Sequence, residues 1–121
     1  MATIRQGDKC WVLTANGKKH YGVCTGYDDH GIPWFVHNTR DGGVVHTTRK
    51  AFSGRRPINI EQHAPEAAEA LVAGRALALV GREYSLFNFN CEHTANLAAY
   101  GRAESRQVEN GVALAGLGTL A

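Results

Sequence analysis

The sequence carries almost no excess of charge, because thirteen Lys and Arg oppose eleven Asp and Glu for a formal net charge of +2. A dense basic face of the kind that binds nucleic acid is not expected, so we predict no nucleic-acid partner. The chain also lacks a long apolar run: its most apolar stretch spans residues 111–121, and a bilayer crossing needs roughly 20 residues. The sequence predicts no transmembrane helix and leaves contact with a membrane surface open.

Cysteine is scarce, and the three cysteines include no CxxC pair. This absence argues against both a disulfide framework and a zinc knuckle. The first ten residues lack the charged and apolar segments of a secretory signal, which predicts a cytoplasmic location. Four histidines are candidate zinc ligands, but they offer no pairs at the usual spacing, so we predict neither a metal site nor a cofactor. These four are His30, His37, His46 and His63.

With 121 residues the chain has the size of one domain, and we expect residues 1–121 to form one, with a short Gly/Ala-rich tail from about 111. The first half contains short β-favouring runs separated by turns. The Asn16-Gly17 pair is a strong signal for a tight hairpin. We expect an antiparallel meander over residues 9–48 with strands at 10–14, 20–26, 33–37 and 44–48, followed by a short strand at 58–60.

The second half of the chain changes to a helical period. Pro65 can occupy a first helical turn, and Gly81 supplies a stop. Apolar residues recur at helical spacing between them, namely Ala68, Leu71, Val72, Ala76, Leu79 and Val80. A second helix is expected from about Cys91 to Tyr100, and a third, short helix over residues 103–110.

Cys91 is the residue whose local sequence points most directly to chemistry. Asn90 is a preferred N-cap residue, which would make Cys91 the first residue of a helix with its sulfur near unpaired backbone N–H groups. A helix N-terminus can lower the pKa of a thiol, and the thiolate is the nucleophilic form. The sequence therefore favours Cys91 as a nucleophile over a small buried residue.

A nucleophilic thiol needs a base, and the predicted strands supply two histidines. His20 opens the second strand and can serve as general base, while His37 ends the neighbouring third strand and can orient the His20 ring. Taken alone, either histidine would be an ordinary surface or core residue. The combination of His20, His37 and Cys91 makes catalysis competitive with that structural interpretation.

The other candidates are weaker. Cys24 shares the predicted face of His20 but lacks a helix dipole, so it is interpreted as a packing residue. Asn90 can present its side chain, or the Cys91 backbone N–H, to a developing oxyanion, and His93 is expected to support the site by hydrogen bonding. The scattered arginines are interpreted as a solvated face, namely Arg40, Arg49, Arg55 and Arg56.

Three segments, taken in order, resemble the lecithin retinol acyltransferase-like family. They are His20-Tyr21-Gly22-Val23-Cys24-Thr25-Gly26, Trp34-Phe35-Val36-His37-Asn38 and Asn90-Cys91-Glu92-His93, followed by a helix and Ser105-Arg106-Gln107-Val108. The resemblance runs from about residue 7 to 110, and the Asn-Cys-Glu-His motif is its most specific part. Two positions depart from the family pattern: Cys24 stands where a Tyr is usual, and Thr94 where a Phe is usual.

The resemblance implies an α+β, circularly permuted papain-like fold in which an antiparallel meander precedes the helices and the nucleophile begins a helix. It implies Cys91 as nucleophile, His20 as base and His37 as orienting residue, in an enzyme that passes an acyl group through a thioester. The expected partner is a small-molecule or lipid acyl substrate, with transfer to an acceptor or to water. Two alternatives stay open: a peptidase or amidase acting on peptide or cell-wall amide bonds, and a catalytically idle binding module.

Overall fold

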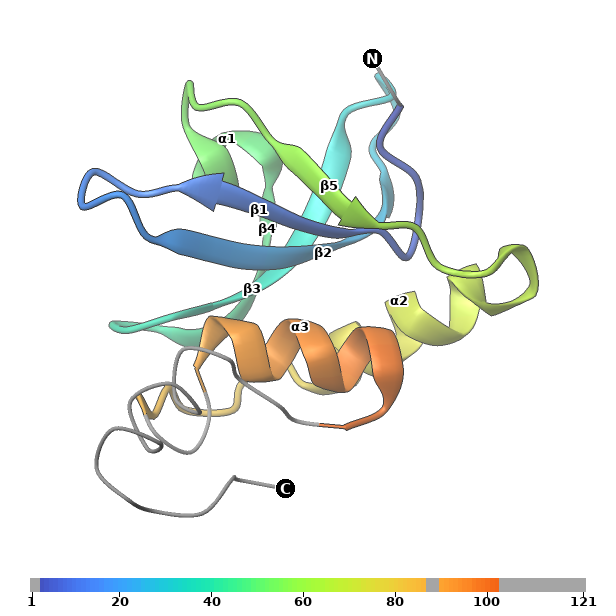
Figure 1. Cartoon of the computed structure of the whole chain (residues 1–121). Helices are drawn as coiled ribbons and strands as arrows, with labels where there is room; N and C mark the ends of the chain where they lie inside the picture. The colour runs from blue at the N-terminus through green and yellow to red at the C-terminus, as the bar shows by residue number, and fades with distance from the viewer. Residues whose placement is uncertain (1–2, 87–89, 103–121) are drawn as a thin grey trace.

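The computed structural model of the chain describes residues 3–86 and 90–102. Along the chain, the strands of a five-stranded antiparallel sheet come first and two ten-residue helices follow them (Figure 1), the order that the sequence predicted. The strands are β1 (Lys9–Leu13), β2 (Lys19–Tyr27), β3 (Pro33–Thr39), β4 (Gly43–Thr48) and β5 (Asn59–Gln62), in the order β4-β3-β2-β1-β5. The predicted helix over residues 103–110 and the tail from about 111 lie outside the described residues.

The predicted hairpin at Asn16-Gly17 joins β1 to β2. Gly17 has φ +74°, a conformation that glycine adopts without strain, and its N–H donates to the Thr14 carbonyl at 2.9 Å. The strands on either side pair in register, with Trp11 opposite Tyr21. Local turn chemistry thus places His20 at the start of β2.

Helices α2 (Glu69–Ala78) and α3 (Cys91–Tyr100) cover one face of the sheet (Figure 1). Between them and the strands lies a core cluster of Tyr21, Val23, Val36, Val44, Val72, Ala76, Leu79, Cys91, Ala95 and Ala98. Strand residues that point to the opposite face, Cys10, Val12, Cys24 and Phe35, form a second cluster together with Phe52, which comes from the segment between β4 and β5. Cys24 therefore lies on the face opposite Tyr21 and Val23, and its predicted sharing of a face with His20 is confirmed because both lie against Phe52.

Helix α2 is shorter than the sequence predicted. A 3₁₀ turn occupies Glu66–Ala68, and α2 begins only at Glu69 because Ala68 has φ −109° and ψ 1°. After α2 ends at Ala78, the Gly81 N–H donates to the Val44 carbonyl at 2.9 Å, so the chain leaves the helix to pair with β4. Leu71 and Val80 were expected on the buried stripe, yet they are 57% and 45% exposed.

A short helix, α1 (Arg49–Ser53), lies between β4 and β5 and was not predicted. The Thr48 hydroxyl caps it by accepting the Ala51 N–H. Five residues are too few to show a helical period, so hydrophobic periodicity could not predict a helix here. This helix matters because it buries Phe52 against the second core cluster.

Candidate functional site

His20 and His37 form a hydrogen-bonded pair, with 2.9 Å between His20 Nε2 and His37 Nδ1. The pairing of β2 with β3 brings them together. Gly22 lies opposite His37, and His20 is two residues before Gly22, so both imidazoles project from the same face of the sheet. The strand and alternation arguments thus predicted two side chains that the fold does bring into contact.

Phe52 of α1 packs against both imidazole rings. Its ring centroid lies 5.5 Å from that of His20 and 5.2 Å from that of His37, and it stacks on Phe35 at 4.6 Å. Gly22 makes room for this ring, because a Cβ added there would lie 2.6 Å from Phe52 Cε1. Sequence reasoning missed Phe52, since its contact with β2 spans thirty residues of chain and leaves no local pattern.

Thr47 of β4 is hydrogen-bonded to the other ring nitrogen of His37, with 2.7 Å between Thr47 Oγ1 and His37 Nε2. Thr47 lies opposite Phe35 and His37 lies opposite Val45, so Thr47 and His37 are diagonal neighbours on one face. Sequence reasoning missed this residue too. The available signal was strand alternation, which places Thr47 on the His37 face once the β3–β4 register is known.

Cys91 is the first residue of α3, whose N-terminus is closed by reciprocal hydrogen bonds. The Asn90 Oδ1 accepts the backbone N–H groups of Glu92 and His93 at 2.9 and 3.0 Å, and the Asn90 N–H donates to His93 Nδ1 at 2.9 Å. The Asn90 Nδ2 donates to the Leu86 carbonyl at 3.0 Å. The Asn90 side chain is therefore engaged in capping, and His93 takes the supporting hydrogen bond expected of it.

The N-terminus of α3 lies where β2 and β3 separate. Their pairing stops at Gly22 and His37, so residues 19–21 of β2 and 38–39 of β3 diverge, and the first turn of α3 lies at this opening (Figure 1). Backbone hydrogen bonds from Tyr21 and from Glu92 reach the Cys91 thiol. On the β3 side, Asn38 Nδ2 donates to Thr94 Oγ1 at 3.1 Å. The splayed strands thus let a helix residue approach the edge of the histidine-bearing face.

Cys91 and His20 line one cavity of about 290 Å³. Its described lining residues are Thr14, Lys18, Lys19, His20, Asn38, Thr39, Arg40, Tyr84, Leu86 and Cys91. His37 is not among them, and it contacts the cavity only through His20. Within the described part of the chain, no hydrogen bond joins Cys91 to either imidazole. The fold therefore brings His20 and His37 into direct contact and places Cys91 beside His20 in a shared cavity.

Burial governs protonation of all three side chains. It lowers the pKa of His20, and it lowers the pKa of His37 from 6.5 to about 4, with the neighbouring His20 charge adding to the effect. Burial also raises the pKa of the Cys91 thiol, against the backbone hydrogen bonds from Tyr21 and Glu92 that lower it. The expectation of a lowered thiol pKa is wrong for this state, because Cys91 is only 9% exposed. At neutral pH the site holds a thiol and two neutral imidazoles.

The remaining cysteines and histidines lie elsewhere. Cys10 and Cys24 are fully buried in the second core cluster, on the sheet face that carries the histidines but outside the cavity, and burial raises the pKa of Cys24 to about 11, as a packing residue would show. His63 Nδ1 contacts Asp8 at 2.6 Å, and His46 Nε2 contacts Thr25 Oγ1 at 2.8 Å. Across residues 3–86 and 90–102, no three His, Cys, Asp or Glu side chains gather closely enough to hold a metal ion.

Comparison with known proteins identifies a family. The family model described as lecithin retinol acyltransferase matches residues 3–104, which include the described lining residues of the cavity and both histidines of the pair. No curated protein matches the chain. None of the helices in the described residues combines the length and apolar character needed to cross a bilayer.

Proposed function

The chain belongs to the lecithin retinol acyltransferase family, and on that premise we propose that it is a cysteine-dependent acyl-transfer enzyme acting on a lipid ester or an amide. Cys91 is the proposed nucleophile, His20 the general base and His37 the residue that orients His20. The observation that carries the proposal is the cavity shared by Cys91 and His20, with His20 hydrogen-bonded to His37 behind it. We also propose that residues 1–121 act as one domain with a circularly permuted papain-like fold.

The protonation states favour a general-base mechanism over a resting thiolate–imidazolium pair. The Nε2 atom of His20 is hydrogen-bonded to His37, so the Nδ1 atom of His20 is the nitrogen left to accept the Cys91 proton. For Nδ1 to be unprotonated, His20 must donate from Nε2 to His37 Nδ1, and His37 must then donate from Nε2 to Thr47 Oγ1. Thr47 is therefore the proposed positioning residue that fixes the productive tautomer of both rings.

The reaction then follows in two transfers. His20 takes the thiol proton as Cys91 Sγ bonds to the substrate carbonyl carbon, and the carbonyl π electrons move to oxygen. Collapse of this intermediate breaks the bond to the leaving alcohol or amine, which receives the proton from His20, and a thioester remains on Cys91. Water or a second acceptor, deprotonated by His20, cleaves the thioester and restores the thiol. Because the Asn90 side chain is engaged in capping, the Cys91 backbone N–H is the proposed oxyanion donor.

A catalytically idle binding module is the second candidate. The observation that favours it is the buried thiol, whose pKa is raised and which has no hydrogen bond to His20. The two candidates differ in one measurable respect, since only an enzyme acquires an acyl group on Cys91.

The proposal is tested by incubating the protein with p-nitrophenyl butyrate at neutral pH and measuring its intact mass. We expect one butyryl adduct on wild type, none on Cys91→Ala, and a normal adduct on the matched control Cys24→Ala. Equal labelling of wild type and Cys91→Ala, or label confined to Cys24, would overturn the assignment. With natural substrates, release of a fatty acid and release of an amine separate lipid from peptide or cell-wall chemistry.

A further inference from the structure

Three cationic side chains surround the cavity that Cys91 and His20 share. Lys18 and Lys19 come from the β1–β2 hairpin and Arg40 follows β3, so the positive charges stand on both sides of the opening between β2 and β3. The sequence suggested only a solvated face for Arg40. We propose that Lys18, Lys19 and Arg40, together the cationic rim, bind an anionic group of the acyl substrate next to the carbonyl that Cys91 attacks. This inference rests on the proposed function.

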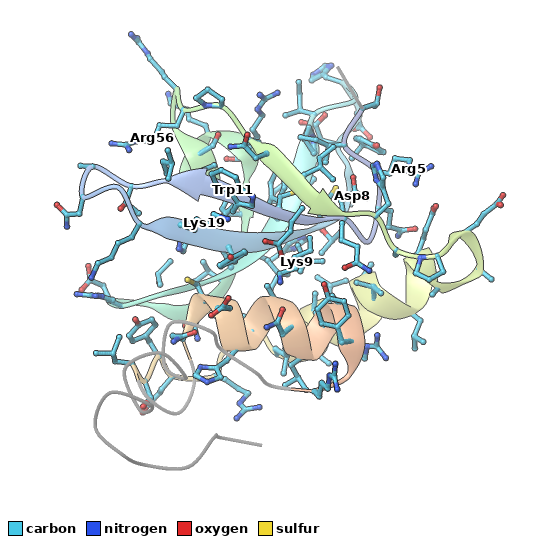
Figure 2. The ribbon with its side chains drawn as sticks, in the orientation of Figure 1. Arg5, Asp8, Lys9, Trp11, Lys19 and Arg56 are labelled. Atoms are coloured by element: carbon cyan, nitrogen blue, oxygen red, sulfur yellow. The ribbon has the colours of Figure 1, made fainter. Side chains whose placement is uncertain are left out.

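Two of the three charges are held in place by aromatic rings. Lys19 Nζ lies 4.4 Å from the Trp11 ring centroid, on the neighbouring strand (Figure 2), and Arg40 Cζ lies 5.9 Å from that of Tyr84. A cation over an aromatic face is attracted by the ring quadrupole and keeps its full charge. The aromatic contacts therefore hold these two cationic side chains at the cavity.

Lys and Arg line this cavity without any acidic residue among the described lining residues. The neighbouring cavity shares Arg40 and, unlike this one, has acidic residues in its lining, namely Asp41 and Glu83. Lys9 lies at the end of β1 that is away from the β1–β2 hairpin, and its Nζ forms an ion pair with Glu61 Oε2 at 2.6 Å. In a chain with a net charge of only +2, three cations at one cavity are a local concentration.

The cavity volume indicates which part of a substrate the rim contacts. About 290 Å³ is at the lower limit of small-molecule pockets, so it holds a polar head and a carbonyl while a long acyl chain extends outside. The anion is a phosphate or a carboxylate, both of which accept hydrogen bonds from Lys and Arg. A phosphate would come from a lipid ester, and a carboxylate from an N-acylated amino acid or peptide.

The test measures binding in the Cys91→Ala protein, which cannot form the thioester. Two matched pairs of monomeric probes separate the sources: dihexanoyl phosphatidic acid against dihexanoyl phosphatidylcholine, and hexanoyl-glycine against hexanoyl-glycinamide. We expect the anionic member of at least one pair to bind about tenfold more tightly than its partner, the effect of a few solvent-exposed charge contacts. Added salt should reduce this preference, because it screens exposed charges.

Variants of the cationic rim test which side chains cause the preference for the anionic probe. Lys18→Gln/Arg40→Gln leaves the Lys19–Trp11 contact intact and should lose most of the preference, whereas Lys18→Arg/Arg40→Lys keeps the charge and should retain it. Lys50→Gln, on α1 and away from the cavity, is the control for loss of a cation. An unchanged preference in Lys18→Gln/Arg40→Gln, or equal binding of both members of both pairs, would overturn the inference.

The experiments distinguish a wrong inference about the cationic rim from a wrong assignment of the enzyme activity. If wild type acquires the butyryl adduct but shows no anion preference, the enzyme assignment stands and the rim inference is wrong. If Cys91→Ala shows a rim-dependent preference but wild type never acquires an adduct, the rim is an anion site of a binding module and the acyl-transfer proposal is wrong.

Discussion

His20 Nε2 and His37 Nδ1 share one hydrogen bond of 2.9 Å, and His37 Nε2 is held in turn by Thr47 Oγ1. In this chain of contacts the protonation of each ring depends on its neighbour. A change at His37 should therefore alter the reactivity of Cys91 through His20, without any contact of its own with the cavity.

Replacing His37 by Asn should lower kcat for p-nitrophenyl butyrate by about a hundredfold, the lower end of the range for loss of an oriented acid–base group. KM should change little, because His37 does not line the cavity. His46→Asn is the matched control, since His46 lies on the adjacent strand with its own Thr25 partner. Equal losses in the two variants would contradict the proposed role of His37.

Thr47→Val should lower kcat by about tenfold, because it leaves a buried imidazole nitrogen without its hydrogen-bond partner. Thr47→Ser keeps the hydroxyl and should restore most of the activity. The comparison of Val with Ser distinguishes positioning from packing, since Val matches the shape of Thr and Ser does not. If Ser is as impaired as Val, Thr47 acts through packing alone.

Alkylation of Cys91 by iodoacetamide should be slow at neutral pH and should rise steadily toward alkaline pH. Burial raises the pKa of this thiol, and only the thiolate is alkylated. Peptide mapping by mass spectrometry measures the rate at each cysteine, with the fully buried Cys10 and Cys24 as internal controls. Fast alkylation of Cys91 at pH 6, with no further rise, would instead reveal a resting thiolate.

Stability should fall as pH is lowered from about 6.5 to 4. In this window the unfolded chain binds protons at its histidines while buried His37, with its pKa of about 4, stays neutral. The unfolded state therefore takes up more protons, and the free energy of unfolding decreases by up to about 3 kcal/mol from His37 alone. Urea denaturation at pH 7 and at pH 4.5 measures the difference, which should be smaller in His37→Gln because that side chain does not titrate.

Gly22→Ala should destabilise the fold by about 1–3 kcal/mol, because the new methyl group would overlap the Phe52 ring. Phe52→Ala removes the ring and should cost about 3 kcal/mol as a large-to-small core change. The double variant should lose less than the sum of the two, since without the ring there is no overlap. Additive losses would show that the new methyl group and the Phe52 ring do not interact.

The site illustrates which features local sequence could predict. The expected antiparallel meander and strand alternation predicted the contact between the His20 and His37 strands, the Asn16-Gly17 turn predicted the β1–β2 hairpin, and the capping preference of Asn90 predicted where α3 begins. These signals are local, because a turn or a cap involves only a few consecutive residues.

The missed features depend on contacts between distant parts of the chain. Phe52 and Thr47 reach the histidines only once β3, β4 and α1 have packed together. The protonation of Cys91 was predicted in the wrong direction because the capping sequence indicates nearby N–H groups but gives no measure of burial. Desolvation is set by the whole fold, and at Cys91 it outweighs the local effect.

The order of elements along the chain has a consequence for synthesis. All five strands precede residue 63, whereas α2 and α3 follow it. A growing chain therefore completes a sheet whose apolar face, with Tyr21, Val23 and Val36, has no cover until the last helix leaves the ribosome. Prematurely terminated copies would carry both histidines but an exposed sheet and no Cys91, so they aggregate instead of accumulating as inactive soluble protein.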